Sequence, residues 1–355
     1  MLACLLVTLV LMQPQDTALS VSDPLALSAE MREFLDKNID RFLPALERLQ
    51  ALDDVVFRNN ALNFKYAEET RTASETFANR NGNCLSFTLL FIAMARYLDL
   101  DARFREVEIA PTFSMTGKYS TLQQHLNAAV LFAEGMYVMD VFPGVNRIEI
   151  GGRIVTDERG LAHFYNNVAV NELGKGNLEA AEFYLKKALD SDPTTPSVWV
   201  NTGVVKMQAG RLQEAEKCYR NALQSDPHDG AAIGNLVIAL RHEGKHREAD
   251  RYAKKAKALW DKNPYRFFIL GMKAYEEGKY AESLENYKRA LKLKNREHNF
   301  YFGMARAYAR LSQPEAAMKN LELAVKYAPD STNRDRYNQK LELLRAQARV
   351  VKPPS

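Results

Sequence analysis

Residues 196–229 read PSVWVNTGVVKMQAGRLQEAEKCYRNALQSDPHD, and this 34-residue pattern decides the fold of the second half of the chain. The same step of 34 separates small residues in neighbouring segments: Gly176, Gly210, Gly244 and Gly278, with Ser312 in the fifth place. It also separates Ala188, Ala222, Ala256, Ala290 and Ala324. A glycine at a turn, an alanine where helices approach and a proline after the second helix predict repeated pairs of antiparallel helices.

This unit is similar to the tetratricopeptide repeat. We expect five units, at residues 162–195, 196–229, 230–263, 264–297 and 298–331. Residues 332–355 then form a capping helix and tail, with the helix over 334–350 covering the last apolar face. The resemblance implies an all-α solenoid whose first helices line a concave groove for an extended peptide.

Three asparagines, Asn167, Asn201 and Asn235, share the sixth position of consecutive units. A carboxamide donates and accepts at once, so such a ladder can bind the backbone of a peptide. The pattern resembles the asparagine ladder of the O-linked N-acetylglucosamine transferases. The alternative is that these side chains only tie neighbouring helices together. After them we expect the groove to turn apolar, near Phe268, Met272, Tyr275 and Phe302.

Residues 22–157 contain one cysteine, Cys84, and one histidine, His125. The motif NGNC (81–84) precedes a segment that is apolar nearly all round, which predicts a helix through the interior of a domain. Asn83 is a typical capping residue, so we expect Cys84 at the amino end of this helix. There the free N–H groups and the helix dipole favour a thiolate and can hold an oxyanion.

Strands are predicted over 102–109, 126–133 and 135–141, and a tight turn joins the last two. His125 opens the second strand and Asp140 closes the third, so the hairpin should bring them side by side. Packing of the strands against the buried helix would bring His125 to Cys84. The three groups would then supply a nucleophile, a base and an orienting acid.

The residues Gly82-Asn83-Cys84, the apolar helix and the following LDLDARF (98–104) resemble the core of the transglutaminase-like superfamily. The resemblance implies a papain-like α+β domain over residues 22–157, with Cys84, His125 and Asp140 as the catalytic triad. This chain departs from the family pattern at two positions. Asp99 replaces the usual glycine of the turn, and Asn127 replaces an aromatic residue that commonly lies two places after the histidine.

We therefore expect thiol-dependent acyl chemistry on a peptide or protein amide, catalysed by a cysteine peptidase or amidase, or by a transamidase. No cofactor and no metal is expected. The repeats would bind the protein substrate or a partner. The alternative is an adaptor with slow or lost catalysis, whose groove mediates protein–protein interaction in the bacterial cell envelope.

Composition bounds the remaining possibilities. The chain has 355 residues, 46% of them hydrophobic and 26% charged, with a net charge of +4, which fits a globular protein of two domains. The basic residues form no dense run, so no nucleic-acid partner is expected. Cys218 is expected to be a small buried apolar group. Four histidines in the repeats are expected on the solvated surface: His228, His242, His246 and His298.

The amino terminus is uncharged and apolar over residues 2–12. This run is shorter than the roughly 20 residues of a membrane-spanning helix, and it predicts a signal segment or an N-terminal anchor over residues 1–20. We expect a protein that is exported, periplasmic or membrane-anchored in a bacterium. Membrane contact would then depend on this segment alone, and a cytoplasmic location is the alternative.

Overall fold

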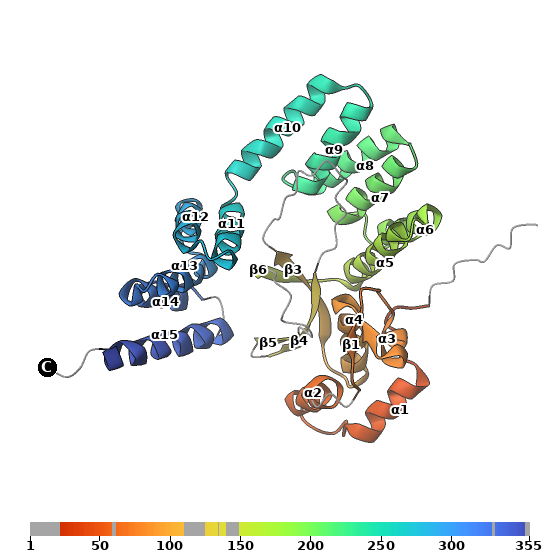
Figure 1. Cartoon of the computed structure of the whole chain (residues 1–355). Coiled ribbons are helices and arrows are strands. Elements are labelled where there is room, and N and C mark those ends of the chain that lie inside the picture. Colours follow the sequence, from red (N-terminus) through yellow and green to blue (C-terminus); the bar gives the residue numbers. More distant parts are fainter. Residues whose placement is uncertain are drawn as a thin grey trace, which may run out of the picture. The chain divides into compact units, whose positions relative to one another are not determined.

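The computed structural model describes residues 22–58, 62–109, 125–133, 135–139, 149–328 and 331–351. Internal contacts divide the chain into two compact units, residues 1–102 and 103–355, which are described separately (Figure 1). The expected signal segment over 1–20 lies outside the described residues. Within the described ranges, no helix combines the length and the apolar composition needed to cross a membrane.

The first unit is organised around helix α4 (Cys84–Tyr97), which contacts α1 (Ala29–Asn38), α2 (Ala45–Asp53) and α3 (Ala73–Asn79). Helix α2 continues into a π-helical turn, Asp54–Arg58. Every residue of α4 from 85 to 95 is buried, so the apolar helix runs through the interior as predicted.

A two-stranded parallel sheet lies directly before α4 in the chain. Strand β1 (Lys65–Tyr66) pairs with β2 (Asn81–Gly82), with Lys65 opposite Asn81. The backbone N–H of Lys65 donates to the carbonyl of Arg80 at 2.9 Å, and that of Ala67 donates to the carbonyl of Gly82 at 2.9 Å. These bonds anchor the segment from which α4 starts.

A four-stranded sheet follows, in the order β5-β4-β3-β6. Its strands are β3 (Ala102–Ile109), β4 (Leu126–Phe132), β5 (Gly135–Met139) and β6 (Glu149–Val155). Strands β4 and β5 are antiparallel, with Phe132 opposite Gly135, which confirms the predicted hairpin. Strand β6 was not predicted, because two glycines weaken its strand pattern. One of them, Gly152, lies so close to Arg105 that an added Cβ would meet its guanidinium carbon at 2.4 Å.

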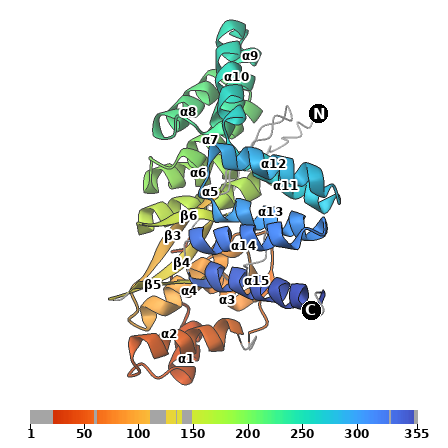
Figure 2. The same ribbon diagram turned by 90° about the vertical axis from the view of Figure 1, so that its left-hand side faces the viewer.

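Ten helices of the second unit follow one another as antiparallel pairs (Figures 1 and 2). The pairs are α5 (Asp157–Gly174) with α6 (Leu178–Ser191), α7 (Pro196–Gln208) with α8 (Leu212–Ser225), α9 (Gly230–His242) with α10 (His246–Asp261), α11 (Pro264–Glu276) with α12 (Tyr280–Leu293), and α13 (His298–Arg310) with α14 (Pro314–Tyr327). The last helix is α15 (Ser331–Val351). Figure 2 shows the later pairs and α15 stacked in order.

The turns inside the pairs have the conformation that the glycine spacing predicts. Their φ values are positive and lie between 74° and 80° at Gly176, Gly210, Gly244 and Gly278. Ser312 occupies the fifth place and adopts a φ of 57° without the freedom of a glycine. The repeat therefore imposes a left-handed residue at this place even where the sequence does not supply a glycine.

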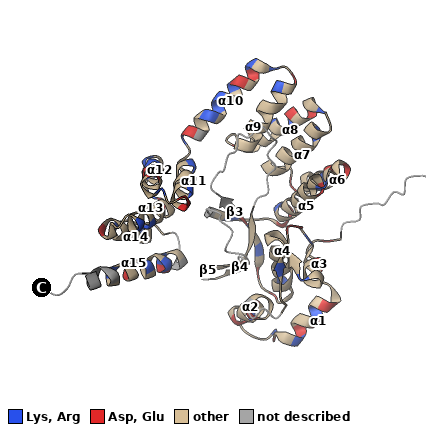
Figure 3. Ribbon diagram, viewed as in Figure 1, with Lys and Arg blue, Asp and Glu red and all other residues tan. Residues whose placement is uncertain are grey.

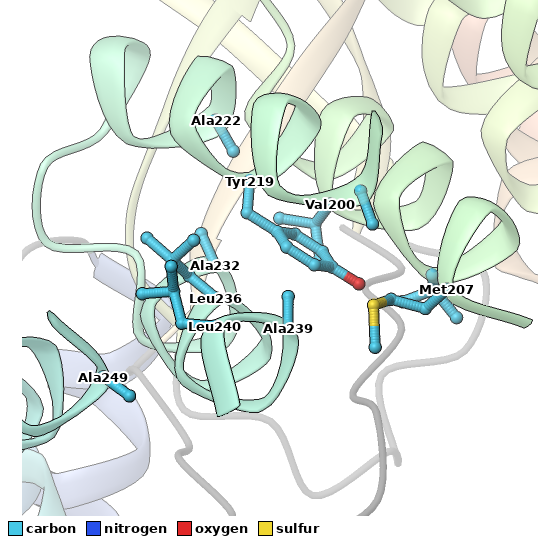
Figure 4. Packing of buried hydrophobic residues seen from close by; sticks show 11 residues of the cluster. Val200, Met207, Tyr219, Ala222, Ala232, Leu236, Ala239, Leu240 and Ala249 are labelled. Atoms are coloured by element: carbon cyan, nitrogen blue, oxygen red, sulfur yellow. The ribbon is translucent and has the colours of Figure 1, made fainter. Parts of the chain in front are cut away.

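Small residues let the paired helices approach. The five spaced alanines are all buried, with exposed fractions between 0% and 6%. In the cluster shown in Figure 4, the fully buried ring of Tyr219 lies among Val200, Met207 and Ala239. A Cβ on Gly203 would meet this ring at 2.4 Å, so only a glycine allows the ring to pack here.

Helix α15 closes the array, as predicted for a cap. Tyr337 and Leu341 of this helix are buried in one apolar cluster with Ala305 and Leu321 of the preceding pair. The chain is thus a small α+β region followed by a long all-α array.

Candidate active site

Cys84 is the first residue of α4, and it is half-buried. The predicted cap is present: Asn83 Oδ1 accepts from the backbone N–H of Ser86 at 3.0 Å. The same amide donates to Thr70 Oγ1 at 2.7 Å, which holds the capping side chain in place. A cysteine at the capped start of a buried helix lies beside free N–H groups of the first turn.

The glycine of the motif has a packing role. A Cβ on Gly82 would meet Ser86 Cβ at 2.5 Å. Ser86 is fully buried; its Oγ accepts from the backbone N–H of Arg71 at 2.8 Å and donates to Asn83 Oδ1 at 3.1 Å. Gly82 therefore permits the close approach that orients the first turn of α4.

The turn after α4 explains how Asp99 can replace a glycine. Asp99 has a φ of 55°, in the left-handed region that aspartate tolerates better than most residues. Its carboxylate lies 3.4 Å from Arg41 Nη2 and 3.9 Å from Arg48 Nη1. Arg41 also donates to the carbonyl of Tyr97 and Arg48 to that of Leu98, so the turn is held by one side chain from the α1–α2 connection and one from α2.

His125 lies in the second unit, immediately before β4, and is 8% exposed. Its carbonyl accepts from the backbone N–H of Val107 at 2.9 Å, which fixes its place beside β3. Asn127, on the same strand face, is buried and accepts from Arg105 Nη1 at 3.4 Å. At this position the chain thus has a buried amide bound to an arginine in place of an aromatic ring.

The triad itself remains a prediction. Cys84 and His125 belong to different units, and Asp140 lies outside the described residues. The structure describes the helix start that carries the thiol and the strand that follows the imidazole.

A buried charged cluster on β3 was missed by the sequence analysis. Glu106 accepts from Arg153 Nη2 at 2.7 Å and from Arg159 Nη2 at 3.1 Å, and His163 Nε2 lies 2.9 Å from Glu106 Oε1. Burial raises the pKa of Glu106, but His163 and the two arginines outweigh it and hold that pKa far below its usual range. The only sequence signal is the spacing of Arg159 and His163 by four, which is common on helices.

The three asparagines of the predicted ladder are buried, with exposed fractions of 5% for Asn167, 0% for Asn201 and 2% for Asn235. Asn201 Nδ2 donates to Asn166 Oδ1 of the preceding pair at 2.8 Å. This bond supports the alternative role for Asn201, in which it ties neighbouring helices. Asn167 differs, because its Oδ1 has no hydrogen-bond partner among the described residues.

The expectation that Phe268 lies in an apolar part of the groove is wrong. Phe268 is only 6% exposed and packs against Phe300 in the core, with ring centroids 5.0 Å apart. Tyr275 and Phe302 are half-buried, but arginines lie against their rings.

Of the remaining thiol and imidazoles, Cys218 is buried as predicted, and burial raises its pKa to about 11. His228, His242 and His246 are exposed. The prediction for His298 is wrong: it is 8% exposed, and its Nδ1 lies 2.8 Å from the Tyr337 hydroxyl of the terminal helix.

Comparison with known proteins identifies both parts of the chain. The family model of the transglutaminase-like superfamily matches residues 35–141. Models of the tetratricopeptide repeat match residues 172–237 and 298–331, and a further TPR-repeat model matches 271–312. No curated protein matches the chain.

Solved structures are similar to about half of the chain. YrrB, described as a TPR protein with an unusual peptide-binding site, is 22% identical; the match covers 50% of this chain and 92% of YrrB, with a TM-score of 0.27. PilF from Pseudomonas aeruginosa is 21% identical, with 55% and 99% covered and a TM-score of 0.28. MamA from Desulfovibrio magneticus RS-1 is 18% identical, with 49% and 98% covered and a TM-score of 0.28. The chain is therefore a transglutaminase-like domain followed by several tetratricopeptide repeats.

Proposed function

We propose that the protein catalyses thiol-dependent acyl chemistry on a peptide or protein amide, with Cys84 as the nucleophile. The observation that carries the proposal is the position of Cys84: half-buried, first in a helix capped by Asn83, within the 35–141 match to the transglutaminase-like superfamily. The thiolate is the form of cysteine that attacks a carbonyl carbon.

In the proposed reaction, the Cys84 thiolate attacks an amide carbonyl, and a tetrahedral oxyanion forms beside the N–H groups of the first turn of α4. His125 gives a proton to the leaving amine as the carbon–nitrogen bond breaks and a thioester remains. Asp140 orients the imidazole. Water that attacks the thioester regenerates the thiol and yields an acid, whereas an amine that attacks it yields a new amide.

Two measurements test whether Cys84 is the nucleophile: selective alkylation of its thiol, and the masses of the peptide products. Wild-type protein and Cys84→Ser are incubated with a peptide library, with and without a fluorescent primary amine, and the products are identified by mass spectrometry. Products that require Cys84 support the proposal: cleaved or deamidated peptides indicate hydrolysis, and amine-labelled peptides indicate transamidation. Undiminished turnover by Cys84→Ser, or no selective alkylation of Cys84, contradicts it.

A second candidate is an adaptor without useful catalysis, whose repeats bind a partner. The buried Asn127 at the position of the family's aromatic residue favours it. In this case the wild-type protein turns over no member of the library, while partner capture is the same with Cys84→Ser.

An exported or membrane-anchored location in a bacterium fits either function, and protease access to the protein in intact spheroplasts tests it.

Peptide binding by the repeats is part of both candidates. Because Asn201 already bonds to Asn166, we assign the stronger peptide contact to Asn167, whose Oδ1 can accept from a peptide N–H. The partner is then held by its backbone at the start of the array.

A further inference from the structure

The far end of the array carries three arginines among aromatic rings. Phe302, Arg306 and Arg310 are spaced by four and so lie along one face of α13. Tyr275 of α11 and Arg336 of α15 lie against this face. We call these five residues the basic–aromatic surface.

These side chains form two groups of contacts, one around the Tyr275 ring and one around the Phe302 ring. The guanidinium carbon of Arg306 lies 4.3 Å from the centroid of the Tyr275 ring, and Arg310 Nε donates to the Tyr275 hydroxyl at 3.3 Å. The guanidinium carbon of Arg336 lies 5.2 Å from the centroid of Phe302. The rings therefore hold the arginines in place by stacking and by hydrogen bonding.

The three arginines of this surface form no ion pair with any carboxylate in the described part of the chain. Several other arginines of the array are paired with carboxylates: Arg211 with Glu182, Arg220 with Glu216 and Glu248, Arg345 with Glu322. Figure 3 shows the usual arrangement, in which acidic and basic positions are interspersed along helices such as α10.

The charge of the surface acts on its tyrosine. Burial raises the pKa of Tyr275, but Arg310 and Arg306 outweigh burial and lower that pKa below its usual value. Two acidic residues are sequence neighbours of residues in this surface: Glu276 follows Tyr275 on α11, and Asp335 precedes Arg336 on α15. The surface itself contains three arginines, so positive charges outnumber these two carboxylates. The local field thus favours an anion.

We propose that the basic–aromatic surface binds an extended acidic peptide segment of a partner protein, with carboxylates on Arg306 and Arg310 and an apolar side chain on Phe302. A guanidinium presents paired N–H donors that match a carboxylate, and a ring that already orients it reduces the entropy lost on binding. Charge complementarity is the argument for this occupant. The proposal deepens the partner-binding part of the proposed function and does not depend on acyl transfer.

The test uses the full-length Cys84→Ala protein, so that turnover does not alter the probe and failure of the thiol chemistry does not affect the result. The probe is a fluorescein-labelled ten-residue peptide with four glutamates and one phenylalanine, and its control has glutamine for each glutamate. Anisotropy is measured at low and at physiological salt. We expect the acidic peptide to bind, the glutamine peptide to bind at least tenfold more weakly, and salt to weaken the complex.

The double variant Arg306→Gln/Arg310→Gln is expected to weaken binding at least tenfold. Arg289→Gln is the matched control, because Arg289 is also exposed and lies 4.2 Å from the centroid of an aromatic ring, Phe267, but on α12. It should change affinity less than twofold. Circular dichroism and thermal unfolding confirm that each variant is folded.

Reversal of the charges at Arg306 and Arg310 distinguishes direct pairing with the peptide's carboxylates from a general attraction between the protein and an acidic peptide. Arg306→Glu/Arg310→Glu should lose the acidic peptide and gain a peptide in which lysines replace the glutamates. Three outcomes overturn the proposal: equal binding of the glutamate and glutamine peptides, equal loss in Arg289→Gln, or displacement of the acidic peptide by single-stranded DNA at lower concentration than by unlabelled peptide.

Discussion

His163 Nε2 lies 2.9 Å from Glu106 Oε1, and this buried contact joins strand β3 of the sheet to the first helix of the repeat array. Arg159, one helical turn earlier on α5, binds the same carboxylate and also Asp192, whose Oδ2 lies 3.0 Å from its Nη1. Val107, the next residue of β3, donates to the carbonyl of His125. The cluster therefore links the strand beside the candidate base to the start of the array, within one compact unit.

We expect Glu106→Gln to lower the free energy of unfolding by about 2–4 kcal/mol at pH 7, because it removes one of the two carboxylates that Arg159 binds and the only one that His163 contacts in the described part of the chain. Urea unfolding followed by circular dichroism measures this loss. Glu179→Gln, on the first turn of α6, is the control, because Glu179 is exposed and forms none of the ion pairs found in the described part of the chain. Equal stability of Glu106→Gln and wild type would contradict the structural role of the cluster.

Wild type and Glu106→Gln should also differ in how their free energies of unfolding depend on pH. The pKa of Glu106 is lowered in the folded state, so its contribution to stability is present above the ordinary glutamate value of 4.5 and is lost as the pH falls below it. The difference in unfolding free energy between wild type and Glu106→Gln should therefore shrink between about pH 5 and pH 3. A difference that grows on acidification would reverse the sign and refute the assignment.

Ser312→Gly should stabilise the array by about 0.5–1 kcal/mol. Ser312 has a left-handed backbone conformation, which is less favourable in free energy for serine than for glycine. The reverse exchange, Gly210→Ser, should destabilise by a similar amount. A Cβ on Gly210 meets no atom within 4 Å, so the backbone conformation alone is tested there. Thermal unfolding of both variants measures the effects, and shifts of the same sign would contradict the argument.

Gly82→Ala should destabilise the first unit by about 1–3 kcal/mol and slow alkylation of Cys84, since the new methyl group collides with Ser86 in the first turn of α4. Gly174→Ala is the matched control, because a Cβ there meets no atom within 4 Å. Unfolding curves and the rate of iodoacetamide labelling are compared. Unchanged values for Gly82→Ala would show that the motif's glycine is not needed for packing.

Cys84 should react with iodoacetamide well before Cys218 in the folded protein. Cys84 is half-buried, whereas Cys218 is 7% exposed and burial raises its pKa to about 11. Labelling is followed by peptide mapping in a Cys4→Ser background, which removes the third thiol. Denaturant should abolish the difference; faster labelling of Cys218 in the native protein would contradict the burial.

Asn201→Ala and Asn167→Ala should separate the two roles of the predicted ladder. Loss of Asn201 breaks a buried hydrogen bond to Asn166 and should cost about 1–3 kcal/mol in unfolding free energy. Loss of Asn167 should cost less than about 1 kcal/mol but weaken capture of peptides from an immobilised random library. If Asn167→Ala captures the same peptides with equal affinity, the ladder takes no part in peptide binding.

The sequence by itself determined the repeated helix pairs and the capped, buried helix that follows Cys84. The step of 34 predicted the helix pairs, the turns at the spaced glycines and the alanines where the paired helices approach. The run after Cys84 predicted a buried helix, and Asn83 predicted its cap. These are local or periodic signals, and backbone preference and helical periodicity are enough to interpret them.

Only the tertiary structure decided which polar groups meet across distant segments. The ion pairs of Glu106 with Arg153 and Arg159 join residues 47 and 53 positions apart, and the basic–aromatic surface depends on the packing of α11, α13 and α15. The bond from His298 to Tyr337 spans 39 positions and turned an expected surface histidine into a buried one. Such pairings follow from how elements pack, and a charged or aromatic residue in the sequence does not specify which partner it will reach.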